Sequence, residues 1–376
     1  MALAFLKVDT SSRNIGLDVL RAVAILLVLL SHGRQILPPN GWVNYFGFFG
    51  VELFFVLSGF LIGKILIKTF ISFASEVKPI HLLDFWIRRW FRTLPNYYLF
   101  VFLNVVIGAL VLKQQTFSFT YLLFVQNLYS GNLPFMPESW SLSVEEWFYL
   151  SFPLWLFLFV RSLQFNLSKK ILWGILSYIG LFTALRVLAV LFGGIGWPAI
   201  RFIVLCRLDA IGFGILAAFF DVFYPLQFKK YKKVLLGLGF CCLLFTVYLS
   251  SQNFTSPDNS GYYFKMFFFT QTSIGFALIL PFLMGIDIKN RIIRDAFSHL
   301  SIISYSLYLI HYSVVLKLIL LIKGKYGVHW VPSYFSYWIL SIVLATMCYR
   351  FFEKPTTDLR LRFLQKNRPS EALVVA

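Results

Sequence analysis

The first long apolar stretch of the chain, LDVLRAVAILLVLLSHG at residues 17–33, contains an arginine and a histidine, Arg21 and His32, eleven residues apart. Over that spacing an α-helix turns through roughly 1,100°, about 20° more than three full turns, and rises about 16 Å. The two side chains are therefore expected on one helix face. Ionisable groups are costly inside a membrane, so a helix that carries two of them is expected to have a functional role. An imidazole can take a proton from a hydroxyl group, and His32 is therefore a candidate catalytic residue. The alternative is that Arg21 extends to the membrane surface and His32 is interfacial.

Two other apolar segments carry carboxylates. Glu52 stands early in GVELFFVLSGFLIG, at about the expected depth of His32, where it could orient the imidazole. It could equally be a solvated carboxylate at a helix start. Glu145 and Glu146 are adjacent in SWSLSVEEWFYL, so at most one of them faces the interior of a helix bundle.

The segment HLLDFWIRRWFRTLPNYY, at residues 81–98, places three arginines at the expected start of another helix: Arg88, Arg89 and Arg92. Arg89 and Arg92 are three residues apart and share a face, a geometry that suits two guanidinium groups on one phosphate. The alternative is a positive anchor on the cytoplasmic side.

Later segments repeat the pattern of polar residues in apolar surroundings. RLDAIGFGIL contains Arg207 and Asp209, and SYSLYLIHYSVV contains Tyr305, Tyr308 and His311. Arg207 and Asp209 could neutralise each other inside a bundle, and His311 could be a packing residue. From the sequence alone, a structural role and a catalytic role are equally compatible with these residues.

The elements that must position these residues are membrane helices. The 376 residues are 59% hydrophobic and 13% charged, with a mean hydropathy of +0.76. Runs long enough to cross a bilayer recur along the whole chain, which predicts an all-α, polytopic bundle forming one membrane-embedded domain over 1–376. About ten spans are expected, at 15–33, 46–67, 85–112, 140–160, 171–192, 201–221, 234–250, 266–286, 300–322 and 333–352.

Basic residues predict the orientation of the bundle in the cell membrane. They gather before residue 15, at 64–89, 161–170, 229–233 and 289–294, and after 353, which is every second loop. Since cytoplasmic loops are rich in lysine and arginine, both termini, about 1–14 and 353–376, should be cytoplasmic. The alternation requires FSFTYLLFVQNLYSGNLP, at 117–134, to be re-entrant or interfacial. Lys317, Lys323 and Lys325 then fall on the outer side, against the rule.

Composition also excludes other classes of function. The net charge of +18 is explained by topology, and no soluble basic face that could bind nucleic acid is expected. Cys206, Cys241, Cys242 and Cys348 lack metal-ligand spacing and are expected to be packing residues. No metal site is therefore predicted.

Seven segments in order, from LDVLRAVAILLVLLSHG through FWIRRWFRTLPNYY to ISYSLYLIHYSVV and FFEKP, resemble the membrane-bound acyltransferase-3 family. The resemblance covers nearly the whole chain and implies an O-acyltransferase of sugars or other hydroxyl-bearing molecules. It matches the family's arginine-to-histidine spacing at Arg21 and His32 and its RxxR motif at Arg89 and Arg92. Many members have aspartate where this chain has Glu52. The esterase-like domain of some relatives is not expected here.

The resemblance implies acyl-CoA as donor, with acetyl-CoA the default by analogy. Arg88, Arg89 and Arg92 would bind its phosphates, and Arg21 would hold the pantetheine arm. His32 would act as general base or as a transient acyl acceptor, oriented by Glu52 or Glu145.

The acceptor is expected to be a glycan of the cell envelope or an exported glycan. Aromatic residues in GWVNYFGFF and QNFTSPDNSGYYF could line a sugar site, although membrane interfaces have the same composition. A small molecule such as a macrolide is the alternative acceptor. A secondary transporter is the alternative function, and it predicts internal repeats, which the arginine and histidine motifs do not show.

Overall fold

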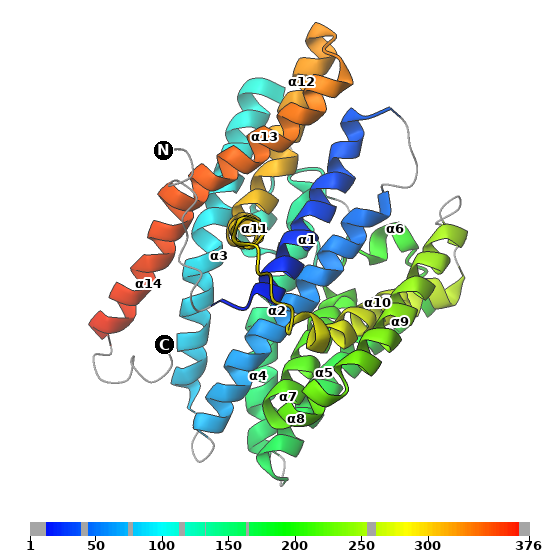
Figure 1. The fold of residues 1–376 in the computed structure, drawn as a ribbon, viewed down its shortest axis with the longest axis vertical. Helices are drawn as coiled ribbons and strands as arrows, with labels where there is room; N and C mark the ends of the chain where they lie inside the picture. The colour runs from blue at the N-terminus through cyan, green and yellow to red at the C-terminus, as the bar shows by residue number, and fades with distance from the viewer. Residues whose placement is uncertain are drawn as a thin grey trace.

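The computed structural model describes residues 13–38, 44–73, 78–112, 117–131, 133–162, 165–253 and 261–367. The described residues form helices and no strand. The α-helices are α1 Ile15–Gly33, α2 Asn44–Ser72, α3 Pro79–Ile107, α4 Trp140–Ser162, α5 Leu167–Leu191, α6 Trp197–Ile200, α7 Leu208–Phe223, α8 Pro225–Lys230, α9 Lys232–Asn253, α10 Tyr262–Leu283, α11 Arg291–Ile310, α12 Lys317–Tyr326, α13 Trp330–Cys348 and α14 Lys354–Asn367. The prediction of an all-α, polytopic membrane protein is confirmed (Figure 1).

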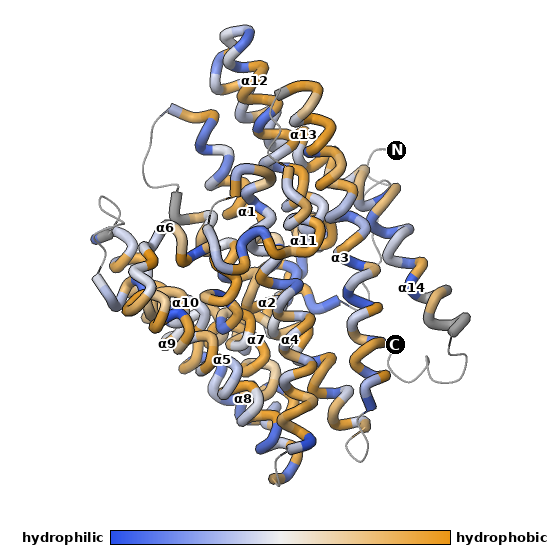
Figure 2. The backbone as a smooth tube through the Cα atoms, turned by 180° about the vertical axis from the view of Figure 1, so that it is seen from behind, coloured by the Kyte–Doolittle hydropathy of each residue, from blue (hydrophilic) through white to orange (hydrophobic). Residues whose placement is uncertain are grey.

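Eight helical stretches in the described part of the chain are long and apolar enough to cross a bilayer, where about ten were predicted. The predicted spans 140–160 and 201–221 correspond to α4 and α7, which are not among the eight. Helix α7 has 16 residues and is largely buried by its neighbours. Helix α4 carries two adjacent glutamates, yet Leu150, Leu154 and Leu158 form an exposed leucine stripe along it. Figure 2, in which the chain is coloured by residue hydropathy, shows that hydrophobic residues predominate along the helices of the bundle.

Other predicted boundaries change in the structure. The segment at 117–134 contains a short 3-10 helix, Phe119–Leu123, and no spanning helix among its described residues. Helix α3 begins at Pro79, six residues before the predicted start at 85. Where a cytoplasmic tail was predicted from 353, a π-helical turn, Tyr349–Glu353, leads from α13 into α14. Residues 1–12 and 368–376 of the predicted terminal segments lie outside the described residues, as do parts of GWVNYFGFF and QNFTSPDNSGYYF.

Close helix packing holds α2 at the centre of the bundle, against α1 and α7. A Cβ atom on Gly59 would lie 2.0 Å from the carbonyl oxygen of Ile211, and one on Gly214 would lie 2.1 Å from that of Val56. Only glycine allows two backbones this close, since any side chain carbon would overlap the facing carbonyl oxygen. Small residues play the same part in other membrane helix interfaces.

Polar contacts fix both ends of α1. The Asn14 side chain accepts a hydrogen bond from the Leu17 amide at 3.0 Å and donates to the Met284 carbonyl at 3.0 Å. The buried Asp18 carboxylate pairs with Arg13 and accepts a 2.7 Å hydrogen bond from Ser301 of α11. Near the other end, the Tyr337 hydroxyl of α13 donates to the Leu29 carbonyl at 3.1 Å. These contacts set the rotation of the helix that carries Arg21 and His32.

Candidate active site

A cavity lies inside the bundle, between α1, α2, α3, α4 and α11. It contains about 840 Å³ of space free of protein atoms, part of it open to the outside. Its polar lining residues are Arg21, Ser58, Arg89, Arg92, Thr93, Ser141, Glu145, Tyr149, Ser304, Tyr305 and Tyr308. Four residues predicted for the site from three separate sequence segments thus meet at one cavity.

The cavity is strongly cationic. Arg21, Arg89 and Arg92 all line it, and none of their guanidinium groups forms a hydrogen bond or an ion pair with another described residue. Arg89 lies ten residues after the start of α3, so it is about 15 Å into the helix rather than at its surface end. Arg88, predicted with them, is not among the residues that line the cavity. Three unpaired guanidinium groups beside one glutamate make a site for an anion.

Glu145 is the glutamate of the adjacent pair that faces the cavity. Its Oε2 atom accepts a hydrogen bond from the Tyr149 hydroxyl at 3.1 Å. The Ser58 hydroxyl lies 2.7 Å from the Tyr149 hydroxyl and completes a chain of three polar groups across α2 and α4. Glu145 therefore has partners inside the cavity.

His32 forms a pair with His311. The His32 Nδ1 atom is 2.7 Å from His311 Nε2, the ring centroids are 5.0 Å apart, and the Tyr312 ring packs 4.7 Å from His32. His311 Nδ1 is 2.8 Å from the Tyr308 carbonyl oxygen, which can only accept, so Nδ1 carries the hydrogen. With both rings neutral, His311 Nε2 accepts from His32 Nδ1. The lone pair on His32 Nε2 is then left for another proton.

Tyr308 separates the histidine pair from the cavity. It lines the cavity, and its ring lies 5.7 Å from that of His311, which is one helical turn further along. Its hydroxyl donates to the Glu138 carbonyl at 2.9 Å and lies 2.6 Å from the Ser141 hydroxyl. His32 is not among the lining residues. The cavity therefore ends one side chain short of the histidines.

A π-helical turn, His311–Leu316, presents His311. The Glu138 carboxylate accepts hydrogen bonds from the Ser313 hydroxyl at 2.7 Å and from the Ser313 amide at 3.3 Å. Burial raises the pKa of the Glu138 carboxyl, while the bonds from Ser313 oppose that rise. π-helical turns are uncommon and often occur at functional sites.

Glu52 does not contact His32, contrary to its predicted orienting role. Its carboxylate pairs with Arg207, the residue before α7, and accepts a 3.1 Å hydrogen bond from Ser273 of α10. The reason is helical geometry, because Val51 and Phe54 face the cavity while Glu52 projects from the opposite side of α2. Arg207 and Asp209 do not pair with each other either, since Asp209 pairs with Arg186 at 2.7 Å.

The sequence did not assign roles to several residues that contact the site. His311 and Tyr308 stood out only as polar residues in an apolar helix, and Ser58, Ser141 and Tyr149 gave no signal. Among the described residues, no group of three or more His, Cys, Asp or Glu side chains could hold a metal ion.

Comparison of the sequence with known protein families identifies one family that matches the chain. Residues 14–350 match the family described as acyltransferase domain. The chain is 27% identical over 378 residues to the O-acetyltransferase OatA of Staphylococcus aureus (strain NCTC 8325), and 28% identical over 379 residues to a putative O-acetyltransferase of strain COL. Each alignment covers 90% of this chain and 56% of the relative, so the chain spans little more than half their length. No solved structure matches the chain.

Proposed function

The chain belongs to this acyltransferase family, and on that premise we propose that it transfers an acetyl group from acetyl-CoA to a hydroxyl group of a cell-envelope or exported glycan. The observation that carries the proposal is the cavity with three unpaired arginines, which ends next to a pair of hydrogen-bonded histidines. The first feature suits a polyphosphate donor and the second suits proton transfer.

The arginines would bind the donor. Arg89 and Arg92 would contact phosphate groups, because planar guanidinium groups bind phosphate oxygens in a bidentate manner. Arg21, on α1, would hold the part of the donor that extends toward the histidines. Helix α1 is continuous from Ile15 to Gly33, so Arg21 and His32 are separated by about 16 Å along the helix axis. An extended pantetheine arm is of comparable length.

His32 would act as the general base. Its free Nε2 lone pair takes the proton of the acceptor hydroxyl while the hydroxyl oxygen attacks the thioester carbonyl carbon. The carbon–sulfur bond then breaks, and the thiolate leaves with the proton returned from the imidazolium. The alternative is attack by Nε2 itself on the thioester carbonyl carbon, which breaks the carbon–sulfur bond, releases the thiolate and forms an acyl-imidazole. The acceptor hydroxyl then attacks this acyl group, the carbon–nitrogen bond breaks, and the hydroxyl proton returns the imidazole to its neutral form.

Tyr308 would have to move for this reaction. Its side chain ends the cavity on the side of the histidine pair, and two hydrogen bonds, to Ser141 and to the Glu138 carbonyl, hold it there. A rotamer change that breaks these two contacts would join the cavity to His32.

Donor binding can be tested with a non-reactive thioether analogue of acetyl-CoA and purified protein in neutral nanodiscs. Arg92→Gln and Arg89→Gln should each weaken binding at least about 10-fold, since each removes a charge-assisted contact worth about 1.5–3 kcal/mol. Arg291→Gln is the matched control, because Arg291 is exposed and remote from the cavity. Unchanged affinity in both cavity variants would refute the donor site.

The acceptor class can be tested in cells. Surface glycans from cells with the protein, without it, and with His32→Ala should be compared by mass spectrometry. The proposal predicts a mass increase of one acetyl group per modified unit in the first sample alone. Identical spectra in all three would contradict a glycan acceptor, and an acetylated small molecule in the medium would support the alternative.

A further inference from the structure

The end of the bundle that carries His32 has an unexplained excess of positive charge. The described residues at this end are 31–38, 117–131, 133–139, 192–206, 261–265 and 317–330, and Glu138 is the one acidic residue among them. Glu138 is 3% exposed and directs both carboxylate oxygens to Ser313. Basic side chains at this end are Arg34, Arg201, Lys265, Lys317, Lys323 and Lys325. Of these, Arg201, Lys317, Lys323 and Lys325 form no ion pair with a described residue.

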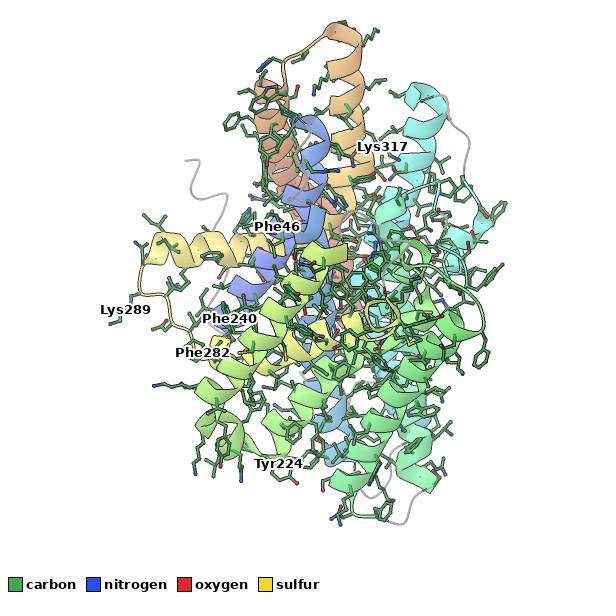
Figure 3. The ribbon with its side chains drawn as sticks, turned by 90° about the vertical axis from the view of Figure 1, so that its right-hand side faces the viewer. Phe46, Tyr224, Phe240, Phe282, Lys289 and Lys317 are labelled. Atoms are coloured by element: carbon green, nitrogen blue, oxygen red, sulfur yellow. The ribbon has the colours of Figure 1, made fainter. Side chains whose placement is uncertain are left out.

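The opposite end is different. There, Lys64 pairs with Asp221 at 2.6 Å. Figure 3 shows Lys317 in the upper half of the view and Tyr224, which precedes α8, near its lower edge. Loops rich in lysine gather toward the Tyr224 end, where the positive-inside rule accounts for them. The same rule predicts a depletion of lysine around Lys317, so topology does not explain the charge there.

Arg201 connects this charge to the histidines. It follows α6, whose Trp197 packs in one cluster with Phe48 at the start of α2. The neighbouring Gly47 lies against Ser31, the residue before His32. The exposed Arg201 guanidinium stands 4.2 Å above the Phe202 ring, within electrostatic reach of the His32 imidazole.

Two lysines of the adjoining helical segment reach the same region. Lys317 follows the π-helical turn of His311 and is within electrostatic reach of Glu138. Lys323 donates a 2.8 Å hydrogen bond to the carbonyl of Ile36, four residues after His32. Both side chains are half-buried, so they lie against this surface instead of extending freely to lipid headgroups.

We propose that this end binds an acceptor bearing carboxylate or phosphate groups, with Arg201 and Lys317 placing its anionic group beside the hydroxyl presented to His32. The inference rests on the proposed function and narrows its substrate to acidic glycans. Fixed positive charge around a catalytic base raises the local concentration of an anionic substrate and speeds its association.

The test is a binding comparison in nanodiscs of phosphatidylcholine. The probes are a fluorescent oligosaccharide containing uronic acid, its carboxyl-reduced form, and a glycerol-phosphate oligomer. We expect at least one acidic probe to bind 10-fold or more tightly than the reduced probe, with the difference falling as salt rises. Arg201→Gln and Lys317→Gln should shrink that difference. Lys289→Gln, an exposed lysine at the left edge of Figure 3 and well separated from Lys317, should leave it unchanged.

Several outcomes would overturn the inference. Equal binding of acidic and reduced probes would do so, as would a preference that survives in both variants. A preference that is lost when anionic lipid is added, because the headgroups then neutralise the basic side chains, would assign the charge to the membrane surface instead. Acetyl transfer is measured in the same samples with labelled acetyl-CoA. Charge-dependent binding without transfer to any probe would count against the proposed function while supporting an acidic ligand.

Discussion

At the scale of single residues, hydrogen-bond direction decides what His32 can do. The carbonyl oxygens of Leu307 and Tyr308 lie within 3.1 and 2.8 Å of His311 Nδ1, and this fixes the proton on that atom. The fixed proton in turn leaves His311 Nε2 as the acceptor for His32. Under the proposed function, His311 would be a positioning residue, which holds His32 in the tautomer that has a free Nε2 lone pair.

Replacement of His311 tests this role. His311→Ala should lower kcat for acetyl transfer by about 10- to 100-fold with little change in the KM for acetyl-CoA, as for other residues that orient a catalytic group. His311→Asn should recover part of the loss, because its amide oxygen can accept from His32 Nδ1. The measurement is steady-state kinetics across a pH series, in which the acid limb should shift in the alanine variant. If activity fell only in proportion to the amount of folded protein, and the acid limb of the pH profile did not shift, His311 would have a structural role only.

Glu52 has a different predicted phenotype. Because it neutralises the buried Arg207, Glu52→Gln should destabilise the fold by about 3–5 kcal/mol, as expected when one partner of a buried ion pair is removed. The double variant with Glu52→Leu and Arg207→Met should recover much of that loss. The readout is the fraction of folded protein after heating in detergent. A Glu52→Gln protein that is stable but inactive would restore the catalytic assignment.

At the scale of the elements, the sequence predicted the long helices well, because continuous apolar runs have few other stable forms in a bilayer. It did not predict that polar segments form helices when they pack on the bundle. One such helix is α14, which lies against α3. The π-helical turn at His311–Leu316 also had no signal in the local sequence, and its Ser313 contacts Glu138, which is distant in sequence.

The contact between α2 and α7 gives a prediction for packing. Gly59→Ala should destabilise the protein by about 1–3 kcal/mol, the usual cost of overpacking, because its Cβ would overlap the Ile211 carbonyl oxygen. Gly180→Ala on α5 is the matched control, since nothing lies within 4 Å of its Cβ position. Thermal unfolding of the two purified variants in the same detergent compares them. Equal midpoints would show that the helices can separate without cost.

At the scale of the whole molecule, the site depends on pairings that no local pattern contains. His32 and His311 are 279 residues apart in sequence, and Glu52 and Arg207 are 155 apart. The sequence proposed Arg21, His32, Arg89, Arg92 and Glu145 as site residues by type and spacing, and four of them, all but His32, line one cavity in the structure. It proposed Glu52 or Glu145 to orient His32 and did not propose His311, because the contact between His32 and His311 depends on how distant helices pack against α1.

Orientation in the membrane is a further prediction at this scale. The basic loops predict that the ends of α2, α4 and α8 face the cytoplasm and that Lys317 faces outward. Single cysteines at Lys170 and Lys325, in a chain whose native cysteines are replaced, should differ in labelling by an impermeant maleimide. In intact cells the Lys325 position should react and the Lys170 position should not. The reverse pattern would place the donor cavity toward the outer side of the membrane and the histidines toward the cytoplasm, which is the opposite of what the proposed function requires.

The central claim is that His32 performs the transfer while the arginine cavity binds the donor. One measurement separates the two: acetyl transfer and binding of the acetyl-CoA thioether, both determined on His32→Ala in nanodiscs. We predict transfer reduced at least about 100-fold, as for removal of a general base, with donor affinity within about twofold of the unaltered protein. Transfer at the unaltered rate by folded His32→Ala protein would contradict the account.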